Sequence, residues 1–401
     1  MSQCLRLTSS MLTVGLVCAA RSIVAAPMLE LTVGSETHVG KSLGHDSEVC
    51  WIAQQDGRVT RVPLQNVSSF RKIDDRFRSL ETIEVRNRLR REFGHGWEIV
   101  GTGHYLVCAP NGRGQLFANT FEDVYRSFRS YFSRRGFELP QPEFPLIAVV
   151  YPTEQSFAAN CANDEVPFAP GLKGYYHRLT NRTSLFESQD DQLVDAALPH
   201  AAGGLLADLI PNRRHSVDSL STYGTASLAG ALWDGNVEGD LKDTIVHEAT
   251  HQVAYNLGLH TRIGDNPKWI TEGLATMFEA EGTRKNAGGG RPQQRLNLER
   301  FEQFATYVER RRNPGALAEF ITNDRLFQTA TLDAYAQAWA LTFYLAETRS
   351  AQHAKFLKSV SARDPLKSYS PEERLADFQR AFGDDLNRLD VAFVRFLEDL
   401  R

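Results

Sequence analysis

The sequence is poor in cysteine and carries no strong charge of either sign. Only 5 of its 401 residues are cysteine, and no C-x-x-C pair occurs, which excludes a disulfide-rich scaffold and a cysteine metal knuckle. The formal net charge of −4 provides no global field that would attract nucleic acid or an anionic membrane. No Walker loop and no GxGxxG that opens a helix is present. We therefore expect no nucleic-acid partner.

Long apolar runs are confined to the start of the chain. Residues 7–20 are mostly apolar, Arg6 precedes them, and small residues follow as far as Ala26, as in a secretory signal peptide. The run is too short for a bilayer span and Arg21 interrupts it. We predict a signal peptide over residues 1–26, an exported chain (periplasmic, secreted or cell-surface) and no stable membrane span after cleavage. An uncleaved anchor and a buried first helix stay open as alternatives.

Three cysteines remain outside this leader. Cys4 and Cys18 fall within it, which leaves Cys50, Cys108 and Cys161, an odd number at wide spacing. We expect these three to be small buried side chains, with a single disulfide as the alternative.

The length of the chain predicts more than one compact unit, because 401 residues exceed what one hydrophobic core usually supports. Residues 27–75 alternate in the manner of short strands, with a hairpin turn at Asp56-Gly57. This region resembles the small Src-homology-3-like β-barrels appended to exported bacterial proteins. Two roles stay open for it: binding a partner, and packing against the neighbouring domain.

The sequence pattern in the middle of the chain predicts a small α/β layer. A charged helix is expected at residues 79–93, and an amphipathic helix opens at Thr120, where Asp123 completes a capping-box pattern, and ends at Gly136. Strands are expected at residues 105–107 and 146–151, and edge strands within 174–186 with a turn at Asn181.

Beyond Gly290 the pattern is helical to the end of the chain. The expected segments are 296–312, 332–348, 353–360 and two within 371–400. The preceding stretch, 284–294, is loop-like, and either links two units or covers a cleft.

Residues 247–251 read His-Glu-Ala-Thr-His, which matches the pattern H-E-x-x-H. On a helix, the i and i+4 spacing brings both imidazoles to one face at metal-binding distance. Asp240 is a suitable N-cap for this helix and Gly258 a suitable residue after its C-terminus. An apolar stripe lies nearly opposite the histidines: Leu241, Ile245, Ala249 and Val253. We therefore expect a helix that buries one side and presents metal ligands on the other.

A third ligand is expected from residues 267–275. Asn266 as N-cap and Pro267 as the first helical residue would start a second helix that carries Glu272. Two neutral imidazoles and one carboxylate, with one position left open, suit catalytic zinc. The sequence therefore predicts one Zn²⁺ per chain, held by His247, His251 and Glu272.

The stretch from His247 to Glu279 resembles the gluzincin metallopeptidases, in which H-E-x-x-H is followed by a glutamate ligand, often within W-x-x-E-G-x-A. It looks more specifically like the uncharacterised exported gluzincin-like proteins of bacteria, in the peptidase MA-like group, and the likeness extends weakly over residues 97–346. The resemblance implies thermolysin-like hydrolysis of peptide bonds, in which Glu248 activates the water on the metal. It departs from the family at Thr276, where an acidic residue is frequent, and Glu279 could orient a histidine instead.

These observations together predict an α+β fold class. A small β-barrel-like domain (27–75) would precede a zincin-like catalytic region (95–290), and residues 291–401 would form the helical C-terminal part of the same unit.

Gluzincins commonly add a protein donor that stabilises the developing oxyanion. Tyr335, on a predicted helix rich in small residues that would let it approach the metal helix, is our candidate for this catalytic role. Tyr255 and His260 are rivals, and a core position for Tyr335 is the alternative.

Three functions follow in order of preference. The first is a zinc metallopeptidase that acts on a peptide or protein. The second is a zinc amidase or hydrolase for cell-wall or other non-protein substrates. The third is a non-catalytic binding protein in which zinc only stabilises the fold.

Overall fold

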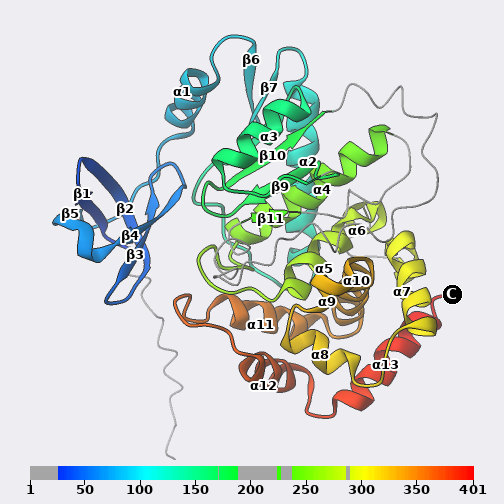
Figure 1. The fold of residues 1–401 in the computed structure, drawn as a ribbon. Helices are drawn as coiled ribbons and strands as arrows, with labels where there is room; N and C mark the ends of the chain where they lie inside the picture. Colours follow the sequence, from blue (N-terminus) through cyan, green and yellow to red (C-terminus); the bar gives the residue numbers. More distant parts are fainter. Residues whose placement is uncertain (1–25, 170, 188–223, 227–236, 286–289) are drawn as a thin grey trace, which may run out of the picture.

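The structure, a computed structural model, describes residues 26–169, 171–187, 224–226, 237–285 and 290–401. The predicted signal peptide lies outside the described residues apart from Ala26. The fold class is α+β, as predicted: an antiparallel sheet near the N-terminus, a mixed sheet with helices on both faces, and a helical C-terminal part (Figure 1). In the described part of the chain, no helix is both long and apolar enough to cross a membrane.

The N-terminal sheet has the strand order β4-β3-β2-β1-β5. Its strands are β1 (Met28–Val33), β2 (Glu36–His45), β3 (Val49–Gln54), β4 (Val59–Pro63) and, after a 3₁₀ turn at Leu64–Asn66, β5 (Val67–Asp74). The predicted hairpin joins β3 to β4, and Gly57 in its turn has a φ of +90°. The barrel-like closure that we predicted is wrong. β4 and β5 form the two edges of an open sheet and most side chains of β5 are exposed, although Leu31, Cys50, Ile52 and Val62 form a buried apolar cluster on the sheet.

One face of this sheet packs against the rest of the chain. Trp51 and Ala53 share a buried cluster with Phe144, which precedes β8. The backbone N–H of Val59 donates to the carbonyl of Leu179 at 2.7 Å. Packing against the neighbouring unit is therefore observed, and a binding partner for the sheet stays a prediction.

The second sheet has the order β11-β9-β10-β8-β7-β6. Its strands are β6 (Trp97–Gly101), β7 (Tyr105–Pro110), β8 (Leu146–Tyr151), β9 (Gly174–His177), β10 (Arg182–Phe186) and β11 (Gly224–Ala226). β7, β8 and β10 run parallel, and the other pairs are antiparallel. Side chains alternate between the two faces: Cys108 packs towards α1 (Thr82–Phe93) and α3 (Glu154–Asn163), and Val107 towards α2 (Gly114–Arg134) and α4 (Val237–Asn256).

Two local predictions in this region are wrong. α2 begins at Gly114, before Thr120, and the Thr120 hydroxyl donates to the carbonyl of Leu116 within the helix, so no capping box forms there. The strands within 174–186 were expected at an edge, but β10 lies between β8 and β9, and β11 covers β9. The turn at Asn181 is confirmed, with a φ of +58°.

Polar side chains of α4 fix this helix on the sheet. Gln252 donates through Nε2 to the carbonyls of Ile147 and Asn181, both at 2.9 Å. One turn on, Asn256 donates to the side chain of Asn181 at 2.7 Å. These buried contacts set the rotation of α4, and the predicted apolar stripe is confirmed, because Ile245, Ala249 and Val253 are buried and Leu241 partly so.

The ends of α4 and α5 (Lys268–Glu279) were only partly predicted. Gly258, with a φ of +75°, terminates α4 as expected. Asp240 does not cap the helix, which starts at Val237. Asn266 does not cap α5 either, since its side chain bonds to the backbone of Thr261 and Gly264. Asp324 instead accepts the N–H of Lys268 at 2.9 Å.

The C-terminal part is helical, as predicted, and surrounds α5 and α10 (Figure 1). Its elements are α6 (Glu281–Lys285), a 3₁₀ turn (Pro292–Arg295), α7 (Leu298–Arg310), α8 (Ala316–Thr322), α9 (Leu326–Thr329), α10 (Thr331–Thr348), α11 (Ser350–Ser361), α12 (Pro371–Phe382) and α13 (Leu386–Glu398). The expected loop at 284–294 thus contains helical turns at both ends, and its residues 286–289 lie outside the described part.

Glycine at position 273 allows α5 and α10 to meet. A Cβ atom there would lie 2.2 Å from Oγ1 of Thr342 and 2.5 Å from the carbonyl oxygen of Ala338. One turn earlier on α5, Trp269 packs between Phe356 and Phe378, with ring centroids about 6 Å away. The small residues of α10 therefore bring it close to α5, the helix of Glu272, where we had expected an approach to the H-E-x-x-H helix.

Candidate metal centre

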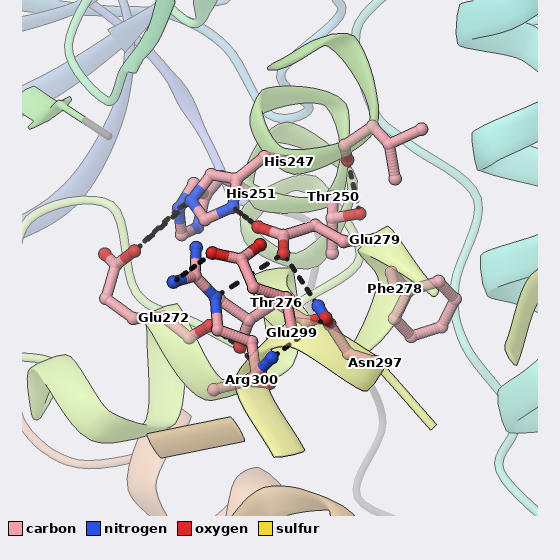
Figure 2. Close-up of polar contacts among 12 residues, drawn as sticks. His247, Thr250, His251, Glu272, Thr276, Phe278, Glu279, Asn297, Glu299 and Arg300 are labelled. Carbon is pink, nitrogen blue, oxygen red and sulfur yellow. Dashed lines mark hydrogen bonds and ion pairs between the residues drawn. The ribbon is translucent and has the colours of Figure 1, made fainter. Parts of the chain in front are cut away.

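His247, His251 and Glu272, the three predicted ligands, lie together in the structure. Each offers one ligand atom, and these atoms lie within 4.8 Å of one another. Nε2 of His247 is 3.1 Å from Nε2 of His251, and Oε2 of Glu272 is 3.3 Å and 3.5 Å from these two nitrogens. α4 supplies both imidazoles one turn apart, and α5 brings the carboxylate towards them (Figure 2).

The three side chains are better arranged to bind a metal ion than to hydrogen-bond with one another. All are buried, and Oε2 of Glu272 has no hydrogen-bond partner among the described residues, although it lies between two imidazoles. A buried carboxylate oxygen without a partner is costly, and a cation held by the three atoms would satisfy it. Two imidazoles and a carboxylate are a typical donor set for zinc.

The electrostatics of the centre favour a positive charge. Burial lowers the pKa of His247, but the contacts with Glu272 and Glu279 and the charge of Glu248 outweigh it and raise that pKa to about 10. Burial raises the pKa of Glu272, but the charge of His251 and the contact with His247 hold it well below its usual range. A metal ion bound at these atoms would compete with a proton.

A second carboxylate, that of Glu279, contacts His247 at the ring nitrogen opposite Nε2. Oε1 of Glu279 lies 2.7 Å from Nδ1 of His247, the ring nitrogen that faces away from His251. Oε2 of Glu279 accepts a hydrogen bond from Nδ2 of Asn297 at 2.9 Å and lies 3.9 Å from Nε of Arg300 (Figure 2). This arrangement fixes the His247 ring with Nε2 towards the other two ligands, so Glu279 has the orienting position that we had suggested.

Asn297 and Arg300 are site residues that sequence reasoning missed. They lie on or just before α7, beyond the part of the chain that carries the motifs, and neither belongs to a recognisable pattern. Thr276, the departure from the gluzincin pattern, donates its hydroxyl to the carbonyl of Glu272 at 2.7 Å and so stays within its own helix.

Glu248 is fully buried beside the three ligands. Its Oε2 accepts the backbone N–H of Tyr176 in β9 at 2.8 Å, and its Oε1 has no partner among the described residues. Burial raises the pKa of Glu248, His247 and His251 lower it, and the balance is a pKa of about 7. One oxygen is therefore fixed by the sheet, and the other is left unpaired within the site.

Tyr335, the predicted donor, lies on α10, and its ring is close to His247. Its ring centroid is 6.4 Å from that of His247, and the guanidinium of Arg300 lies 5.7 Å from its ring. Burial, together with the charges of Glu272 and Glu248, raises its pKa well above the usual value. Its phenol is thus protonated and close to the ligands.

The two rivals of Tyr335 lie on another side of the ligands. Tyr255 is one turn after His251 and packs on Tyr176 and His260. His260 is buried with an unpartnered Nε2, and burial together with the charge of His251 lowers its pKa to about 3. Both rings pack together at the C-terminal end of α4.

The three remaining cysteines, Cys50, Cys108 and Cys161, are free and buried. The expectation of small buried side chains is confirmed, and the alternative of a disulfide among them is excluded.

Comparison with known families gives one similarity. Residues 242–367 match a family described as a protein of unknown function (DUF1570). This segment runs from the first half of α4 to the loop after α11 and so contains His247, Glu248, His251, Glu272, Glu279 and Tyr335. A search of curated proteins finds no match.

Proposed function

We propose that the chain is a zinc-dependent peptidase of the gluzincin type, with Glu248 as its general base. The observation that carries this proposal is the state of the Glu248 carboxylate. One of its oxygens is fixed by Tyr176, and the other is buried, without a partner among the described residues, one position along α4 from a metal ligand. A site that served only to staple the fold would gain nothing from burying an additional carboxylate at this cost.

Zinc, when bound by His247, His251 and Glu272, would supply a Lewis acid and a water of lowered pKa. The chain's own residues then have separate tasks. Glu248, through Oε1, accepts a proton and returns it to the leaving amine. Glu279 keeps the ring of His247 in one orientation and one tautomer.

Tyr335 is proposed as the donor to the oxyanion. Its hydroxyl is protonated throughout the neutral range, because its pKa is raised well above the usual value. Its position next to Glu272 and Glu248 supports this role more strongly than the positions of Tyr255 and His260, which pack together behind His251.

A library of peptides incubated with the zinc-loaded chain tests the proposal, with Glu248→Gln as the matched control. Cleavage by the parent chain and its loss in the variant are expected. Cleavage of cell-wall peptides alone would favour the amidase, and no cleavage of either class by a zinc-loaded chain would favour the binding protein. Export is proposed on the leader-like composition of residues 1–26 alone.

A further inference from the structure

A cavity of about 370 Å³ opens at the C-terminal end of α4, where the N-terminal sheet meets the helical part. Polar and charged residues from four segments line it: Lys41, Glu143, Tyr255, His260, Arg262 and Arg363. Tyr255 follows His251 by four residues, so it lies about 6 Å further along the helix axis. The cavity is therefore adjacent to the metal centre, on the side of Tyr255 and His260.

The cations of this cavity differ in their partners. Nζ of Lys41 lies 2.7 Å from Glu143, and Arg363 has Glu373 and Asp377 at 2.9 Å each. Arg262 has no carboxylate within ion-pair distance among the described residues. Its guanidinium donates only to the backbone carbonyls of Arg178 at 2.8 Å and Leu179 at 3.1 Å.

A second uncompensated guanidinium lies beside Arg262. Arg178 is 4% exposed, donates to the carbonyl of Gly264 at 3.1 Å, and leaves its Nε buried without a partner. The structure shows no carboxylate paired with Arg178 in the part of the chain it describes. Burial lowers the pKa of Arg262 and the charge of Arg178 lowers it further, and the opposing effects of Tyr176, Glu143 and Asp56 do not restore it. Carbonyl oxygens carry no full charge, so these two neighbouring cations, Arg178 buried and Arg262 partly buried, favour an anion in the cavity.

We propose that this cavity binds a carboxylate of the substrate, held by Arg262 and supported by Arg178, so that the enzyme selects peptides with a negative charge close to the cleaved bond. The inference rests on the proposed peptidase function. Guanidinium groups bind carboxylates in a bidentate manner, which supplies both the charge and the direction of recognition. The carboxylate can come from the C-terminus of a peptide or from an acidic side chain.

Binding and cleavage of three peptides test the proposal. They are N-acetylated pentapeptides of alanine and phenylalanine: one with a free C-terminus, one amidated and carrying a glutamate, and one amidated with glutamine in its place. Binding is measured by isothermal titration calorimetry to the full-length Glu248→Gln chain, and cleavage is measured with the parent chain. We expect one or both carboxylate peptides to bind roughly 10-fold or more tightly than the neutral peptide, as is typical of a hydrogen-bonded charge. Which of the two binds identifies the source of the carboxylate.

Variants test whether Arg262 causes the tighter binding of the carboxylate peptides. Arg262→Gln should abolish this preference for a carboxylate, and Arg262→Lys should retain most of it. Arg363→Gln, which alters an arginine of the same cavity that already has two carboxylate partners, should leave it in place. The melting temperature of each variant is checked, and the peptide comparison on the chain with Arg262 intact decides the matter even if a substitution prevents folding.

Two outcomes separate this inference from the proposed function. Carboxylate-dependent binding without cleavage by the parent chain would refute the peptidase and leave the carboxylate site standing. Cleavage of all three peptides at equal rates, with equal binding, would overturn the site and leave the peptidase standing. Absence of binding for every peptide would also overturn the site, and would show that Arg178 and Arg262 serve only to join the β9–β10 turn to the loop before α5.

Discussion

Nδ1 of His247 lies 2.7 Å from Oε1 of Glu279. Glu279 is the last residue of α5, and its carboxylate fixes the imidazole of His247, the first residue of the H-E-x-x-H motif. Glu272 and Glu279 are two turns apart on α5 and therefore act on the same imidazole from two sides, one at Nε2 and the other at Nδ1. The position of α5 on α4 thus decides both the geometry of the ligands and the tautomer of His247.

Removal of this support should weaken metal binding without removing a ligand. Glu279→Gln is expected to lower zinc affinity by about 10 to 100-fold, the range found when partners of ligating histidines are changed. Competition with a chelator of known affinity measures the effect. Glu281→Gln, a change at an exposed carboxylate two residues further on, is the control and should bind zinc like the parent chain. Equal zinc affinity in both variants would show that Glu279 does not orient His247.

Tyr335→Phe tests the proposed oxyanion donor. We expect the turnover rate to fall by roughly 10 to 10³-fold, because a donor aimed at the developing charge would be lost. Zinc content and melting temperature should stay almost unchanged. Tyr344→Phe alters another buried tyrosine of α10 and should keep full activity. A lower melting temperature with normal turnover would place Tyr335 in the core alone.

The buried His353 is expected to make the protein less stable in mild acid. Burial, helped by the charge of Arg135, lowers the pKa of this histidine to about 4, whereas an unfolded histidine titrates near 6.5. Between these two values the unfolded chain binds the extra proton, so the free energy of unfolding decreases as the pH falls from about 6.5 towards 4. The contribution is fully present above about pH 6.5, and about 2 kcal/mol of it is lost by pH 5.

Urea unfolding at neutral pH and at pH 5 measures this effect. His353→Gln should reduce the difference between the two conditions, and His95→Gln, at an exposed position, should leave it unchanged. An identical pH dependence in the His353 variant would contradict the assignment.

Substitution of each ligand should remove the metal. His247→Ala, His251→Ala and Glu272→Ala are each expected to purify without zinc, because two remaining donors hold the ion poorly. His260→Ala removes a buried histidine that is not a ligand and should keep one zinc per chain. Elemental analysis of the four proteins gives the answer, and full occupancy in any ligand variant would remove that residue from the set.

The three side chains that could hold a metal ion were predicted from the sequence because their relationship is local. His247 and His251 are one helical turn apart, and Glu272 lies in a motif whose tryptophan and glycine have packing roles that the structure makes plain. The helix ends were predicted less well, since the caps come from remote residues. Asp324 caps α5 from a position 56 residues later, and Glu98 accepts the N–H of Gly114 at the start of α2.

The supporting residues could not be predicted for the same reason. Asn297 and Arg300 reach Glu279 only because the segment that starts α7 packs beside α5, and Arg178 meets Arg262 only because a hairpin of the sheet lies against the loop after α4. The open form of the N-terminal sheet was likewise not encoded in a local pattern. Alternation predicts strands, but it does not predict whether the two edge strands, β4 and β5, meet.

Zinc content and peptide hydrolysis, measured side by side in the parent chain and in Glu248→Gln, test the central claim most directly. The substitution keeps the size and shape of the side chain and an oxygen that can accept the N–H of Tyr176, but it removes the basic oxygen. The account predicts one zinc per chain in both proteins and a rate of hydrolysis at least about 10²-fold lower in the variant. Equal hydrolysis by two proteins with equal zinc would contradict it.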